Sequence, residues 1–160
     1  MDVLVEYAPR ILAGFRQTLT LLVISGAAAL VLGTLLAAMR VSPVPVLRTA
    51  GAWYVALVRN TPLVLLFTLV TFGLPTVGIR WSFFVFAVST LTLYTAAFVC
   101  EGVRSGINTV SVGQAEAARA LGMTFGQTLR LVVLPQAFRA VIPPLASVLI
   151  ALTKNTAVAE

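Results

Sequence analysis

The chain has 160 residues, of which 59% are hydrophobic and only 10% are charged, and its mean hydropathy is +1.02. Because soluble domains carry about 25% charged residues, this composition excludes an ordinary soluble protein and indicates an integral membrane protein. The net charge of +6 does not indicate nucleic acid binding, since the 11 basic residues lie singly between apolar runs instead of forming a patch.

The N-terminal part of the chain is apolar after a short mixed segment. Residues 1–16 combine charges with aromatic and aliphatic side chains, a pattern that predicts a short interfacial helix. Asp2 and Glu6 stand where a signal peptide carries positive charge, so we expect this segment to remain in the mature protein. Residues 17–39 are uncharged and rich in Gly and Ala, which predicts a first membrane span that packs closely on its neighbours.

Three further uncharged intervals follow. Residues 60–79 and 81–100 each provide the roughly 20 residues that a helix needs to cross about 30 Å of hydrocarbon. The turn-forming residues 73–80 would make these two spans an antiparallel hairpin, and residues 48–58 predict an interfacial helix before them. The uncharged interval at residues 140–153 is shorter than a full span. It fits a plain fourth span, a re-entrant segment or a kinked segment, and the sequence does not decide among them. The predicted fold is an all-α polytopic membrane helix bundle.

Two polar positions stand at the ends of these predicted spans. Arg59-Asn60-Thr61-Pro62 fits a helix start with Asn60 or Thr61 as the cap, but that role leaves Arg59 unexplained, and polar groups at such an entrance also line transport paths. Glu101 is followed one helical turn later by Arg104, which predicts an ion pair that lowers the cost of a carboxylate near the membrane boundary.

The distribution of basic residues predicts the orientation of the chain. Four lie on the side of the N-terminus, Arg10, Arg16, Arg80 and Lys154. Seven lie on the other side, Arg40, Arg48, Arg59, Arg104, Arg119, Arg130 and Arg139. The positive-inside rule therefore predicts an external N-terminus and a cytoplasmic position for the polar interval at residues 114–135.

This polar interval predicts two short helices separated by a glycine. Ser111 with Gln114, and Thr124 with Gln127, have capping-box spacing, while Gly122 would end the first helix and Pro135 the second. A DNA-binding helix-turn-helix is the alternative. Its second helix would present the apolar residues 131–134 where base edges require hydrogen-bond donors, so we expect no nucleic acid partner.

No residue pattern typical of an enzyme is present. The sequence has no histidine, no Gly-x-Ser-x-Gly and no phosphate-binding Gly-rich loop with Lys, so we expect no catalytic residue and no metal site. The single cysteine, Cys100, excludes a disulfide framework and is expected to fill apolar space.

The run Glu116-Ala117-Ala118, three residues, Gly122, nine residues and Val132-Val133-Leu134-Pro135 resembles the EAA loop of the permease subunits of ABC importers. Six further runs look like the polar amino acid uptake branch of that family: residues 59–63, 72–75, 113–114, 134–137, 142–145 and 154–156. The resemblance covers nearly the whole chain. It implies a type I ABC importer permease fold with about four of an expected five spans, as one domain over residues 1–160 with a cytoplasmic coupling loop at about 104–138.

The resemblance also implies two sets of functional residues. The coupling set contacts the ATPase and comprises Glu116, Ala117, Ala118, Leu121 and Gly122. The substrate path set comprises Arg59, Asn60, Thr61, Lys154, Asn155 and Thr156. Lys154 is a candidate for the carboxylate of an amino acid, although extension of its side chain to the interface is an equal alternative.

The implied protein is a multi-pass permease of the bacterial inner membrane that imports an amino acid and is not itself an enzyme. The expected partners are a cytoplasmic ABC ATPase, a second permease in a homo- or heterodimer, an extracytoplasmic solute-binding protein and the lipid bilayer. ATP and Mg would bind the ATPase, and this chain would hold no cofactor. Residues 38–43, 93–98 and 151–156 look most like glutamate-type members, with glutamine or a basic amino acid still open. The alternative is a membrane-embedded assembly subunit without a transport path.

Two departures from the family pattern bear on this prediction. Ser147 stands where the family often has asparagine, and Ala157-Val158 replaces the common Ser-Leu. The sequence stops at Glu160, where the family continues into a fifth span, so we expect either a chain truncated at its C-terminus or a permease in which the final helix is absent.

Overall fold

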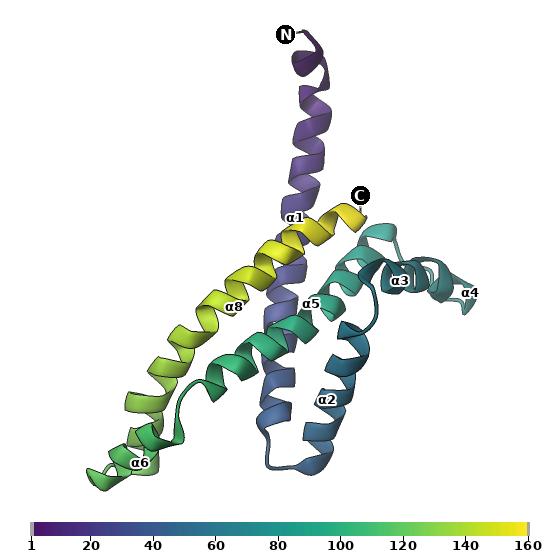
Figure 1. Cartoon of the computed structure of the whole chain (residues 1–160). Helices are drawn as coiled ribbons and strands as arrows, with labels where there is room; N and C mark the ends of the chain where they lie inside the picture. Colours follow the sequence, from purple (N-terminus) through teal and green to yellow (C-terminus); the bar gives the residue numbers. More distant parts are fainter. Residues whose placement is uncertain (1, 160) are drawn as a thin grey trace.

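The computed structural model describes residues 2–159 and, within them, contains helices and no strand. Three long helices, α1 (Asp2–Val41), α5 (Phe83–Asn108) and α8 (Leu134–Asn155), form the frame in Figure 1. α5 lies in the middle, with α1 and α8 packed against it. Helices long and apolar enough to cross a membrane run over Glu6–Val41, Phe83–Asn108 and Phe125–Ala159. The predicted all-α membrane bundle is confirmed.

α1 corrects the prediction of a separate interfacial helix at residues 1–16. One uninterrupted helix runs over Asp2–Val41 with Pro9 inside it. Residues 10–16 contain no proline and only one glycine, so nothing in this stretch ends the helix. Its N-terminal part projects away from the other helices, and Ile11, Leu12 and Phe15 are exposed there.

The second predicted span, residues 60–79, is also wrong as a straight helix. α2 (Pro45–Arg59) is followed by a break at residues 60–62 and then by α3 (Leu63–Thr68), the π-helical η1 (Leu69–Gly73) and α4 (Leu74–Thr76). The segments before and after the break are bent by 99° and together have the length of one broken span or re-entrant loop. Pro62 supplies no N–H group, which favours the break at this position. α2 is not only interfacial, because its Val55 and Val58 are buried against the frame.

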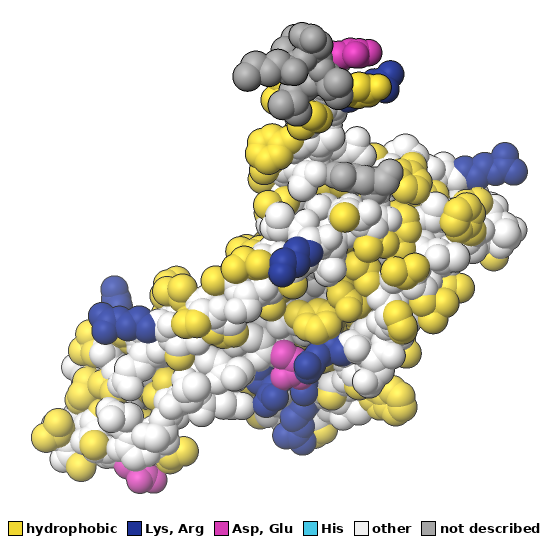
Figure 2. Space-filling model, turned by 45° about the horizontal axis from the view of Figure 1, so that its top comes forward, with side chains coloured by type: hydrophobic (Ala, Val, Ile, Leu, Met, Phe, Trp, Pro, Cys, Tyr) yellow, Lys and Arg dark blue, Asp and Glu magenta, His cyan; other side chains and the backbone are white. Residues whose placement is uncertain are grey.

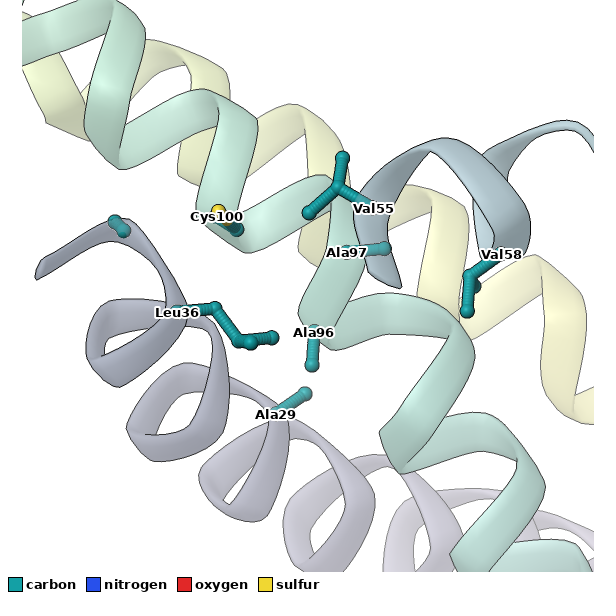
Figure 3. Close-up of a cluster of buried hydrophobic side chains, with 8 residues drawn as sticks. Ala29, Leu36, Val55, Val58, Ala96, Ala97 and Cys100 are labelled. Atoms are coloured by element: carbon teal, nitrogen blue, oxygen red, sulfur yellow. The ribbon is translucent and has the colours of Figure 1, made fainter. Parts of the chain in front are cut away.

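Small side chains let α1 and α5 approach closely. One buried cluster joins these helices to α2 (Figure 3) and comprises Ala29, Leu36, Ala37, Val55, Val58, Ala96, Ala97 and Cys100. A Cβ atom added to Gly33 would lie 2.5 Å from the Cβ of Val99 and 2.7 Å from the carbonyl oxygen of Ala96. Since apolar burial alone does not drive association in lipid, such close backbone packing is the main source of helix contact. The expected packing role of Cys100 agrees with its complete burial.

The polar interval forms the predicted first helix and glycine break. α6 covers Val112–Ala120, and Gly122 has φ +80°, a conformation that glycine adopts without strain. The N–H of Gly122 donates to Arg119 O at 2.9 Å and the N–H of Met123 donates to Ala118 O at 3.2 Å, which is the pattern of a Schellman motif. Among the predicted capping boxes, that of Thr124 and Gln127 is present at α7 (Phe125–Gln127), whereas the Ser111 side chain makes no capping hydrogen bond.

Pro135 does not end the second helix, contrary to the prediction. α7 passes into the π-helical η2 (Thr128–Val133), then into α8 and the short η3 (Thr156–Ala159). A proline ring clashes with the carbonyl four residues earlier in a regular helix, and a wider π turn before it removes that clash. The same arrangement occurs at η1, which is followed by Pro75. α8 therefore extends the polar interval directly into the membrane bundle.

The close contact between α5 and α8 can be tested at Gly106. A Cβ atom there would lie 2.9 Å from the backbone nitrogen of Val141, so Gly106→Ala must displace α8. We expect destabilisation of about 1–3 kcal/mol, measured by thermal unfolding in detergent. Gly14→Ala is the control, because Gly14 lies in α1 with no atom within 4 Å of the added Cβ. Equal melting temperatures for the two variants would contradict this packing.

Candidate functional site

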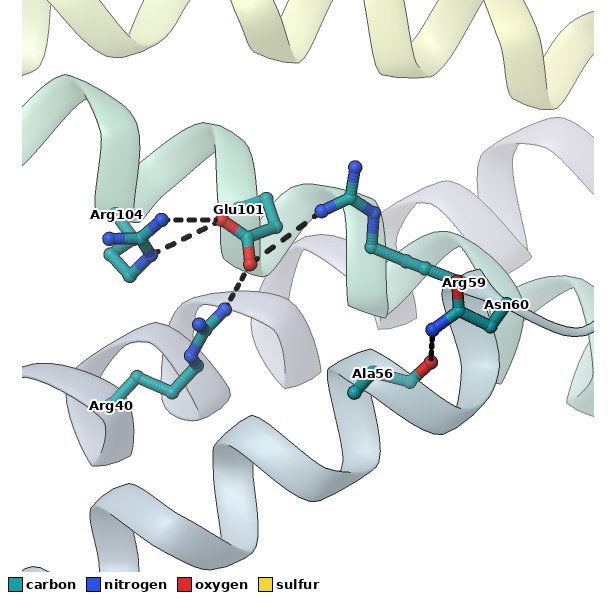
Figure 4. Close-up of polar contacts among 6 residues, drawn as sticks. All are labelled: Arg40, Ala56, Arg59, Asn60, Glu101 and Arg104. Carbon is teal, nitrogen blue, oxygen red and sulfur yellow. Dashed lines mark hydrogen bonds and ion pairs between the residues drawn. The ribbon is translucent and has the colours of Figure 1, made fainter.

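The carboxylate of Glu101 joins three helices (Figure 4). Its Oε1 accepts a hydrogen bond from Nη1 of Arg40 on α1 and lies 3.7 Å from Nη1 of Arg59 on α2. Its Oε2 accepts two hydrogen bonds from Arg104 on its own helix, at 3.2 Å from Nε and 2.9 Å from Nη2. The predicted Glu101–Arg104 pair is confirmed, and two further arginines share the same carboxylate.

The ion cluster of Glu101, Arg40, Arg59 and Arg104 is partly withdrawn from the surroundings. The exposed fractions of the Arg40 and Glu101 side chains are 18% and 21%, whereas that of Arg59 is 45%. Figure 2 shows basic side chains gathered around an acidic one between apolar surfaces. With one negative and three positive charges, the cluster carries a formal charge of +2. Such an excess attracts anions, and a low-dielectric setting strengthens the attraction.

Two cavities meet at Phe98 on α5. The cavity beside the ion cluster, called the arginine cavity, has a volume of about 390 Å³ and is lined by Arg40, Ala52, Val55, Ala56, Arg59, Asn60, Phe98 and Glu101. The second, called the hydroxyl cavity, has a volume of about 370 Å³ and is lined by Tyr94, Thr95, Phe98, Ser147, Val148, Ala151, Leu152 and Asn155. The Phe98 ring lies 5.4 Å from the guanidinium carbon of Arg59 and 5.0 Å from the Tyr94 ring. Their shared wall makes the two cavities neighbours.

Three of the six predicted path residues line these cavities. Arg59 and Asn60 line the arginine cavity, and Asn155 lines the hydroxyl cavity from α8. The structure therefore brings residues 59–60 and 155 to opposite sides of Phe98, although nearly a hundred positions separate them in the sequence.

The other three predicted path residues lie outside both linings. Thr61 donates its hydroxyl to Leu57 O at 2.8 Å, and the buried Thr156 donates to Thr153 O at 2.7 Å. Lys154 is exposed and forms no ion pair with the described side chains of residues 6–159. Their positions indicate local hydrogen bonding for the two threonines and leave Lys154 apart from the cavities.

Sequence reasoning missed Arg40 and the aromatic pair Tyr94 and Phe98 as members of the site. The only signal for the pair was its spacing of four residues on one helix, followed by Glu101 one turn later. Thr95 also lines the hydroxyl cavity, but its hydroxyl oxygen is itself buried and has no hydrogen-bond partner among the described residues.

The predicted coupling residues lie together on and after α6. Glu116 and Ala117 are exposed, Leu121 is 84% exposed and Gly122 has no atom within 4 Å of a Cβ position. Ala118 is different, because it is buried within this chain. Four of the five residues are therefore available to a partner, while Ala118 packs inside. Among the described side chains of residues 6–159, no three His, Cys, Asp or Glu residues come together as they would to hold a metal ion.

Removal of the Glu101 charge tests the ion cluster. In Glu101→Gln, the poorly exposed Arg40 loses its carboxylate, and we expect a loss of roughly 2–3 kcal/mol in stability. Chemical denaturation in detergent would measure it. Glu116→Gln provides the control, because this exposed carboxylate forms no ion pair in the described part of the chain, and its effect should stay below about 0.5 kcal/mol. Similar losses in both variants would contradict a structural role for the Glu101 cluster.

Comparison with known proteins places this geometry in a family. Residues 29–160 match the family described as "Binding-protein-dependent transport system inner membrane component". The glutamate transport system permease protein GluC of Corynebacterium glutamicum is 47% identical, over 97% of this chain and 73% of that protein. The probable glutamine ABC transporter permease protein GlnM of Bacillus subtilis is 43% identical, over 91% of this chain and 67% of that protein.

A solved structure extends the similarity to three dimensions. A chain in the crystal structure of an amino acid ABC transporter with histidines superposes with a TM-score of 0.91 at 32% identity, covering 98% of this chain and 73% of that one. The sequence similarity to GluC and the structural similarity to this transporter chain thus both extend over nearly the whole of the present chain. The chain belongs to the binding-protein-dependent transport system inner membrane components, among the permeases of amino acid ABC transporters.

Proposed function

We propose that this chain is the permease subunit of an ATP-driven glutamate importer. The observation that supports glutamate as the substrate is the arginine cavity. Its ion cluster has two uncompensated positive charges beside Asn60 and Phe98. An excess of positive charge favours an anionic solute over a neutral or cationic one. Two relatives at 47% and 46% identity are named glutamate transport system permeases, which supports the same substrate.

The proposed transport path follows the two cavities around Phe98. Arg59 and Asn60 stand on one side and Asn155 on the other, at the junction of α2, α5 and α8. Discontinuous helices often form solute sites in transporters, and the 99° break after α2 is such a discontinuity. Thr61 follows Asn60 in the chain, and Lys154 and Thr156 flank Asn155. In this proposal, these three residues belong to the ends of the same transport path.

The proposed assembly has an external N-terminus and contains a second permease, a homologue or another copy, and an external solute-binding protein. A cytoplasmic ATPase with its ATP and Mg would dock on the exposed residues Glu116, Ala117, Leu121 and Gly122, and Ala118 would hold the docking helix on its own chain. The single domain over residues 1–160 with a coupling loop at about 104–138 is part of this proposal. The chain would hold no cofactor.

Substrate-dependent ATP hydrolysis tests the proposed function. In proteoliposomes that contain this permease with its partner ATPase, second permease and solute-binding protein, we expect L-glutamate to accelerate both ATP hydrolysis and solute uptake. L-arginine is the cationic comparison and should give less of either. Hydrolysis that no amino acid stimulates would instead favour an assembly subunit without a transport path.

Leu121 provides the sharpest test of ATPase docking. An exposed apolar side chain that becomes buried at the centre of an interface typically contributes about 2 kcal/mol or more, so Leu121→Asp should weaken ATPase binding at least about 30-fold. Gly122→Arg is a less clean probe, because a φ of +80° strains any other residue. Val77→Asp is the control, since Val77 is also highly exposed, at 72%, but follows α4 at a distance from α6 in the sequence. Copurification of the ATPase with both variants would contradict the proposed docking site.

A further inference from the structure

We propose that Arg59 and Asn60 together bind the α-carboxylate and α-ammonium groups of the transported amino acid in the arginine cavity. This inference rests on the proposed function and adds to it the residues that hold the common part of an amino acid. It follows from which hydrogen-bond donors and acceptors around Glu101 already have partners within the chain and which do not.

Arg59 is the surplus arginine of the ion cluster. Glu101 accepts a hydrogen bond from Arg40 and two from Arg104, whereas Arg59 approaches it only to 3.7 Å, beyond hydrogen-bond distance. Arg59 also has the most exposed side chain of the three arginines, at 45%. Its planar group of N–H donors therefore remains available for a second carboxylate, which guanidinium binds in a bidentate manner.

Phe98 holds this guanidinium in position. The guanidinium carbon of Arg59 lies 5.4 Å from the centre of the Phe98 ring, within the range of a cation–π contact. The rest of the cavity wall is largely aliphatic, from Ala52, Val55 and Ala56. The net positive charge of the ion cluster favours an anionic partner for this exposed guanidinium.

Asn60 supplies the complementary acceptor. Its amide Nδ2 donates to Ala56 O at 2.8 Å, which orients the amide (Figure 4), and its Oδ1 accepts no hydrogen bond from residues 6–159, whose side chains the structure describes. A fixed carbonyl oxygen suits an ammonium group. The carboxylate and ammonium of an amino acid are attached to one carbon, and Arg59 and Asn60 are neighbours in the chain that line one cavity. The γ-carboxylate of glutamate has no adjacent ammonium, so the pair fits the α-groups better.

Binding would change the partner of Arg59 without leaving Glu101 unpaired. A substrate carboxylate takes the place of the distant Glu101 oxygen at Arg59, while Arg40 and Arg104 continue to compensate the Glu101 charge. Because the contact between Arg59 and Glu101, at 3.7 Å, is the longest of the cluster, its loss costs little free energy. The amino acid side chain would then extend past Phe98 toward the hydroxyl cavity.

Two isomeric amides of glutamate separate the α-carboxylate from the γ-carboxylate. L-glutamine keeps the α-carboxylate, whereas L-isoglutamine carries an amide there and keeps the γ-carboxylate. Competition against radiolabelled L-glutamate is measured by equilibrium dialysis on the complete permease–ATPase complex without the solute-binding protein, so that only the membrane site is read. For the unmodified complex we expect L-glutamine to compete about tenfold or more better than L-isoglutamine.

Arg59→Gln should weaken glutamate binding about 10- to 100-fold and abolish the preference for L-glutamine over L-isoglutamine. Arg59→Lys keeps the charge but not the planar donors, so the preference should shrink even if Arg59→Gln fails to assemble. Arg48→Gln is the control, as another exposed arginine of α2 outside the cavity, and should bind as the unmodified complex does. The same assay in vesicles of neutral phosphatidylcholine alone should give the same ratios.

The outcomes separate this inference from the proposed function. Glutamate-stimulated uptake by the unmodified complex, together with an unchanged amide preference in both Arg59 variants, would overturn the inference and leave the permease function standing. An Arg59 effect that depends on anionic lipid would assign the cavity to lipid headgroups and also overturn it. Absence of glutamate uptake and binding by the unmodified complex would instead refute the proposed function.

Discussion

One carboxylate in an apolar bundle is the constraint on which the rest of this structure depends. The Glu101 side chain is only 21% exposed, so its charge is unfavourable unless positive groups compensate it, and three helices each contribute one. Arg40 comes from α1, Arg59 from α2 and Arg104 from α5 itself. The hydrogen bond from Arg40 therefore ties α1 to α5 at this point, and the surplus positive charge, which includes Arg59, gives the neighbouring cavity its preference for anions.

Close backbone packing makes this arrangement possible. Gly33 and the alanines of α1 and α5 bring the two helices close enough for Arg40 to reach Glu101. α2 completes the site by packing its Val55 and Val58 on the same cluster before the chain turns sharply. The break after Arg59 then exposes its guanidinium and Asn60 to the cavity instead of burying them inside a continuous helix.

The sequence predicted features that depend on neighbours in the chain. The long apolar helices, the Glu101–Arg104 pair, the Thr124 capping box and the end of the first short helix at Gly122 are all confirmed. Arg40 and Glu101 are 61 positions apart in the sequence, and no local sequence pattern predicts which arginine pairs with a distant carboxylate. The prediction that Pro135 ends the second helix was wrong for another reason. A π turn allows proline inside a helix, and helix propensities do not predict such turns.

The central claim is that Arg40 is committed to Glu101 whereas Arg59 is available to substrate. Two double-mutant cycles test it directly, combining Glu101→Gln with Arg40→Gln or with Arg59→Gln and measuring unfolding free energies in detergent. The predicted coupling is about 1.5–3 kcal/mol for Arg40 with Glu101 and below about 1 kcal/mol for Arg59 with Glu101. Equal couplings, or a larger one for Arg59, would contradict the account.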